Sequence, residues 1–142
     1  MSWAGLFFDI TSPFILSAIA YFLIDRRKVA ADSLRSECDR QLDLLEHECS
    51  QYWLSNLSES DRIRSAAKIR ASVQNLENTI IDLESHTFFG VDLYETRWLG
   101  FKKILTSVPF DTNQANVDAD RFSEILSELG NMRRMIIRRR IQ

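Results

Sequence analysis

The chain has 142 residues and a formal net charge of −2, which leaves room for an anchor and one modest domain and demands no nucleic-acid partner. Only four glycines and two prolines occur along its whole length. Because β-sandwiches and barrels need many turns, this scarcity predicts an all-α chain of long helices.

The N-terminal region is strongly apolar. Residues 3–24 read WAGLFFDITSPFILSAIAYFLI, with one acid, Asp9, and no basic residue, and roughly 17–25 mostly apolar residues can span a membrane as a helix. Basic residues beside a span are retained on the cytoplasmic side, and three follow this run: Arg26, Arg27 and Lys28. We therefore expect a transmembrane anchor over residues 1–25 in a bacterial inner membrane, with the N-terminus outside and residues 26–142 in the cytoplasm.

Two alternatives to an anchor exist for this region. The tripeptide Ala18-Ile19-Ala20 resembles a signal-peptide cleavage site. However, the positive charge follows the apolar run, whereas in a signal peptide it comes before. The second alternative is a buried helix of a soluble protein.

Ser12-Pro13 has the pattern of a helix start, with a serine N-cap and a proline in the first turn. A helix that began there would reach Asp25 after only about 18 Å, which is too short for about 30 Å of hydrocarbon. Either the helix continues through Pro13 with a kink, or residues 3–11 form a separate turn in the outer leaflet.

The anchor also contains side chains that are costly in lipid. A carboxylate at Asp9 must lie at the interface, become protonated, or face water or other protomers. The candidate residues for a pore lining or a protomer contact are Asp9, Thr11, Ser12, Pro13 and Ser17. A pore would require several copies, because one span per chain encloses no channel.

Beyond the basic run, apolar residues recur at steps of three and four, which is typical of helices that pack on one face. A first stripe comprises Leu34, Cys38, Leu42, Leu45, Cys49 and Tyr52, on a helix that nothing interrupts between Ile24 and Leu57. After a polar break, in which Ser58 or Ser60 can act as N-cap, a second stripe comprises Ile63, Ala66, Ile69, Val73, Leu76, Ile80, Leu83 and Thr87.

Two further helices are expected in the C-terminal half. A short one carries Tyr94, Trp98, Phe101, Leu105 and Val108, and the last begins near Val117 and carries Phe122, Ile125, Leu129, Met132 and Ile136. The aromatic clusters at 86–90 and 98–101 are expected to be core or protomer contacts, with a ligand pocket as the alternative. The predicted fold is an all-α chain in which a transmembrane helix continues into a cytoplasmic antiparallel bundle of about four helices.

The C-terminus is strongly basic. Its arginines are Arg133, Arg134, Arg138, Arg139 and Arg140. In an up-and-down bundle the last helix returns toward the bilayer, so these side chains could form a basic collar with Arg26, Arg27 and Lys28 at anionic lipid. Alternatively, these arginines remain in solvent and interact favourably with the negative end of the helix dipole. Binding of nucleic acid or an anionic nucleotide is less favoured, because no aromatic residues are interleaved among them.

No catalytic pattern is present in the sequence. Glycine-rich phosphate loops and the G-x-S-x-G and H-E-x-x-H motifs are absent, and His47 and His86 fall on different expected helices. Cys38 and Cys49 lie eleven residues apart, about 16 Å along a helix, which is too far for a disulfide. We therefore predict no enzymatic activity, no catalytic residue, no metal site and no cofactor.

In layout, with an N-terminal anchor before a cytoplasmic helical bundle, the whole chain resembles small single-pass membrane proteins of bacterial anti-phage systems, including CRISPR-associated accessory proteins. The resemblance implies a homo-oligomeric effector that contacts membrane lipid and permeabilises or depolarises the inner membrane upon infection. A non-conducting tether that recruits a cytoplasmic protein partner, and a phage or plasmid immunity or lysis-control protein, are the alternatives.

Overall fold

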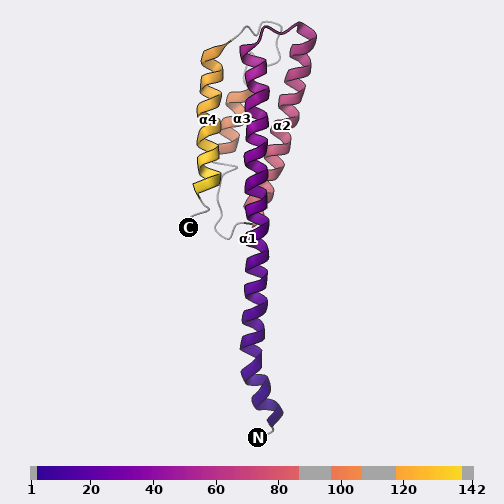
Figure 1. Cartoon of the computed structure of the whole chain (residues 1–142), viewed down its shortest axis with the longest axis vertical. Coiled ribbons are helices and arrows are strands. Elements are labelled where there is room, and N and C mark those ends of the chain that lie inside the picture. The colour runs from indigo at the N-terminus through magenta and orange to yellow at the C-terminus, as the bar shows by residue number, and fades with distance from the viewer. Residues whose placement is uncertain (1–2, 87–96, 107–117, 139–142) are drawn as a thin grey trace.

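The computed structural model describes residues 3–86, 97–106 and 118–138, and within them the side chains of 13–86, 97–106 and 118–136. These residues form four helices and no strand (Figure 1). The helices are α1 (Trp3–Leu54), α2 (Glu59–His86), α3 (Leu99–Thr106) and α4 (Ala119–Arg138). The prediction of an all-α chain with about four helices is confirmed.

Helix α1 is one continuous helix of 52 residues that includes Pro13, about 78 Å long at the usual rise. The helix therefore continues through the proline, as in the first of the two alternatives above. Proline removes one backbone hydrogen bond and bends a helix without necessarily ending it, and the first turns of α1 lie off the axis of the remainder (Figure 1). Among the residues whose side chains are described, which in α1 begin at Pro13, no helix combines the length and apolar character needed to cross a membrane.

Helix α2 begins at a serine cap and runs back along α1. Of the two predicted caps, Ser58 is used: its Oγ accepts a hydrogen bond from the Asp61 N–H at 3.2 Å. Ser72 donates to Glu48 at 2.6 Å, and seven residues later Thr79 donates to Gln41 at 3.2 Å. Seven steps forward on α2 correspond to seven steps back on α1, so the two helices are antiparallel.

Helix α4 also runs antiparallel to α1, on its other side (Figure 1). At its start the Asp118 N–H donates to the carbonyl of Trp53 at 3.0 Å. The Asp118 carboxylate caps the helix by accepting from the Arg121 N–H at 2.9 Å. Fifteen residues later, Arg133 reaches Asp39 of α1 at 2.8 Å. Helix α3 packs against α4.

The core consists mainly of residues from the predicted stripes, although Ile63 of the second stripe is exposed. The fully buried members of the core include Cys38, Leu42, Leu45, Cys49 and Trp53 of α1, Ala66, Ile69, Leu76 and Ile80 of α2, Leu105 of α3 and Ile125 of α4. Trp98 and Phe101 are buried side by side with ring centroids 5.6 Å apart, so this aromatic cluster belongs to the core. Thr87, Tyr94, Val108 and most of the cluster at 86–90 lie outside the described residues.

The predicted helical bundle is confirmed, but it occupies only part of the length of α1. The first buried residue of α1 is Ala31. Below it α1 projects alone from the bundle, and α4 ends beside the point from which α1 emerges (Figure 1). This arrangement has the up-and-down order expected for the four helices.

Candidate functional site

The projecting part of α1 is the most unusual surface of the molecule. Every residue from Pro13 to Val29 is exposed. Large apolar side chains dominate the first part of this segment and each is at least half exposed: Phe14, Ile15, Leu16, Ile19, Tyr21, Phe22, Leu23 and Ile24. A soluble protein seldom exposes a contiguous apolar surface of this kind without a partner for it.

These apolar side chains point in all directions around the helix axis. Successive residues of an α-helix are rotated by about 100°, so Phe14, Ile15 and Leu16 alone face three different sides. A helix that lies on the core of a globular protein has one apolar stripe, whereas a helix that is apolar all round is surrounded by apolar material. The segment is therefore suited to lipid or to several protein neighbours, and poorly suited to one flat partner surface.

The predicted pore-lining residues lie in this projecting part. Pro13 and Ser17 are exposed. The side chains of Asp9, Thr11 and Ser12 lie outside the described part of the structure, although their backbone belongs to α1. Along the axis Asp9 lies about 9 Å from the first helical residue and about 22 Å from Ile24.

A basic band separates the apolar segment from the bundle. Arg26, Arg27 and Lys28 are all exposed. The guanidinium carbon of Arg26 lies 4.6 Å from the centroid of the Phe22 ring, an arrangement in which the cation is attracted by the aromatic face. Such a band between apolar residues and a folded domain is typical of the cytoplasmic boundary of a membrane helix.

The C-terminal arginines do not all share one environment. Arg133 forms ion pairs with Asp39, Asp43 and Glu46 of α1, whereas Arg134 is exposed and donates to the Asn131 side-chain oxygen at 2.6 Å. The remaining members of the predicted basic patch, Arg138, Arg139 and Arg140, have no described side chain.

Arg133 is also distant from the N-terminal basic band. Its partner Asp39 lies twelve residues beyond Arg27, which is about 18 Å along the helix. The structure therefore brings Arg133 to an acidic row on α1, and it does not bring this residue together with Arg26, Arg27 and Lys28.

Among the described residues, no group of three or more His, Cys, Asp or Glu side chains is arranged so that it could hold a metal ion. His47 is within hydrogen-bonding distance of Gln51, and His86 contacts the Asp82 carbonyl. Cys38 and Cys49 are free thiols, and burial raises the pKa of each to about 12. Such thiols are poor nucleophiles and poor metal ligands at neutral pH.

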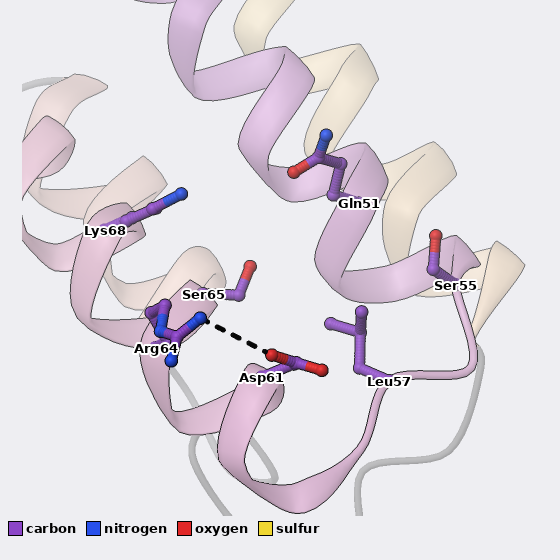
Figure 2. A pocket seen from close by; sticks show the side chains of 7 residues that line it. All are labelled: Gln51, Ser55, Leu57, Asp61, Arg64, Ser65 and Lys68. Atoms are coloured by element: carbon purple, nitrogen blue, oxygen red, sulfur yellow. Dashed lines mark ion pairs between the residues drawn. The ribbon is translucent and has the colours of Figure 1, made fainter.

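A polar hollow of about 390 Å³ lies at the far end of the bundle, between α1 and α2 (Figure 2). Its lining residues are Gln51, Ser55, Leu57, Asp61, Arg64, Ser65 and Lys68. Asp61 receives a hydrogen bond from Ser58 at 2.7 Å and lies 3.7 Å from Arg64, so the acid offsets one of the two positive charges. Sequence reasoning missed this hollow, because its members become neighbours only when α2 folds back on α1.

Comparison with protein-family models, curated proteins and solved structures finds no match for this chain.

Proposed function

We propose that the protein is anchored in a bacterial inner membrane by residues 3–24 of α1, with its bundle in the cytoplasm. The observation that carries this proposal is the lone helix whose large apolar side chains, from Phe14 to Ile24, are exposed on every side. Burying a large apolar side chain contributes about 1.5–3 kcal/mol. With its side chains at least half exposed to water, this segment lacks roughly 10 kcal/mol of that burial free energy. Lipid recovers that free energy on all sides at once.

The dimensions and charges fit the same arrangement. Residues 3–24 are helical throughout and extend about 33 Å, which matches about 30 Å of hydrocarbon. Arg26, Arg27 and Lys28 would then lie at the inner headgroups, where each basic residue contributes about 1 kcal/mol near anionic lipid. The same basic residues orient the N-terminus to the outside.

We further propose that several copies assemble into an effector that opens a pore or collapses the membrane potential, in anti-phage defence as the resemblance in layout implies. A single span cannot enclose a channel. Asp9 lies about 9 Å along the axis from the first residue of the helix. A carboxylate there is energetically costly in contact with lipid, which favours an assembly in which it contacts water or neighbouring copies.

The test is expression in bacteria with a potential-sensitive dye. The full chain should depolarise the membrane. Deletion of residues 3–24 should abolish the effect and Asp9→Ala should reduce it. Ile19→Arg and Leu44→Arg are a matched pair, since their side chains are 51% and 47% exposed. Only the first places a charge in the apolar segment, so only Ile19→Arg should abolish depolarisation.

The native mass in detergent provides an independent check. A stable monomer would contradict the pore. A chain that sediments with membranes yet leaves the potential unchanged at high expression would instead favour a non-conducting tether that recruits a cytoplasmic protein complex. Recovery of the full chain in the soluble fraction would contradict the anchor itself.

A further inference from the structure

An arginine that lies just before α3 and an arginine of α4 line one small hollow on the side of the bundle. The hollow has a volume of about 260 Å³ and is lined by Arg97, Asn131, Arg134 and Met135. Arg97 precedes the first residue of α3, whereas the other three side chains belong to α4. Both arginines are exposed, and Asn131 and Met135 are partly buried.

Among the described residues that line this hollow there is no carboxylate. Arg134 donates to the neutral amide oxygen of Asn131 at 2.6 Å, and in the described part of the chain neither Arg97 nor Arg134 forms an ion pair. The neighbouring Arg133 differs, because three acids of α1 surround it. In the hollow of Figure 2, Arg64 likewise has an acid at 3.7 Å. Among the described residues, the hollow between α3 and α4 therefore combines two positive charges with no lining acid to offset them.

We propose that this hollow binds the phosphate group of a soluble ligand. A guanidinium group presents donors in a planar fork that matches phosphate oxygens, and two forks lining one hollow can hold one phosphate from two sides. The side-chain amide of Asn131 provides one more polar group beside them. A volume of about 260 Å³ falls just below the range of about 300–1,000 Å³ for pockets that enclose a whole drug-sized ligand. The site therefore holds the phosphate and leaves the rest of the ligand toward solvent.

The position of the hollow favours a soluble phosphate over a lipid headgroup as its ligand. Arg134 follows Arg133, whose partner Asp39 lies fifteen residues beyond Ile24, the last apolar residue of the proposed span. This distance is about 22 Å along α1, well beyond the screening length of about 8 Å in physiological salt. The choice of a soluble source rests on the proposed anchor, whereas the phosphate site itself does not.

The binding test uses the full chain in zwitterionic lipid nanodiscs, with inorganic pyrophosphate as the probe in calorimetry. Because a hydrogen bond to a charged group is worth about a factor of ten or more in affinity, Arg97→Ala and Arg134→Ala should each weaken binding at least about tenfold. Arg134→Lys keeps the charge but loses the fork, so it should bind with intermediate affinity. Arg64→Ala is the matched control: it removes the same charge from the other hollow, and it should leave affinity unchanged.

Circular dichroism should show the same melting temperature for all four variants. Any loss of affinity would then result from the change at the site and not from unfolding. An undetectable affinity of the folded wild type for pyrophosphate would overturn the proposal. An equal loss in Arg64→Ala would also overturn it, since it would reveal a general charge effect.

A second arm compares binding to vesicles with and without anionic lipid. The double variant Arg97→Ala/Arg134→Ala should keep the wild-type preference for anionic vesicles. Loss of that preference would show that the hollow binds a lipid headgroup, and it would contradict a soluble ligand. The calorimetry does not depend on depolarisation, so failure of the proposed membrane activity and failure of this site are distinguishable.

Discussion

Arg133 joins α4 to α1, and its replacement tests how the bundle is held together. Its Nε lies 2.8 Å from a carboxylate oxygen of Asp39, a second nitrogen contacts Asp43, and a third lies 3.8 Å from Glu46. Arg133→Met keeps most of the aliphatic stem and removes the charged fork. The three acids, spaced four and three residues apart on one face of α1, then face one another without their shared cation.

The expected cost follows from exposure. The side chain of Arg133 is 30% exposed and its partners are between 41% and 66% exposed. Ion pairs at that exposure contribute about 0.2–1 kcal/mol each, because water screens them. Three pairs that share one arginine, together with the repulsion left behind, give a loss of roughly 1–2 kcal/mol in the free energy of unfolding.

The measurement is urea denaturation of the full chain in non-ionic detergent, followed by far-UV circular dichroism. Urea is uncharged, so the salt concentration can be varied separately. The loss should shrink at about 1 M salt, where the screening length falls to about 3 Å. Arg134→Met is the matched control and should change stability by less than about 0.5 kcal/mol. If the two variants lose equally, or if salt has no effect on Arg133→Met, the assigned ion pairs are wrong.

Three further outcomes are expected. Leu45→Ala, at a fully buried core position, should cost about 2–5 kcal/mol in urea denaturation, and a loss below 1 kcal/mol would contradict the core. Ser72→Ala should cost about 1–3 kcal/mol, because Glu48 loses its donor at 2.6 Å; an unchanged midpoint would contradict this contact. Burial raises the pKa of Cys38 and Cys49 to about 12, so at pH 8 iodoacetamide should label them only after unfolding, with labelling of the folded chain rising as pH approaches 12. Rapid labelling of the folded chain at pH 8, detected by mass spectrometry, would contradict their burial.

Much of the bundle is predictable from the sequence because burial on one helix face repeats every three or four residues. The stripe from Cys38 to Cys49 is fully buried at each predicted position. Ile63 is the exception, since the second stripe includes it and yet it is 56% exposed. Ser72 lies opposite Glu48, so in an antiparallel pair Ile63, nine residues earlier, lies opposite residue 57. Helix α1 ends at Leu54, so it has no helical turn there to cover Ile63.

The surroundings of the arginines could not be predicted in the same way. A basic C-terminus is visible in the sequence, but the register between α1 and α4 decides which arginine meets an acid. Arg133 and Asp39 are 94 positions apart, and no local pattern links them. The pairing of Arg97 with Arg134 in one hollow also depends on the antiparallel packing of α3 on α4.

Spin-label depth measurements on the full chain in vesicles would show whether the projecting helix inserts into lipid. A label at Ile19 reports the apolar segment, and a label at exposed Ser33 reports the base of the bundle. We expect oxygen to relax the label at position 19 strongly while a water-soluble nickel complex does not, and we expect the reverse at position 33. Equal access of the nickel complex to both labels would contradict membrane insertion.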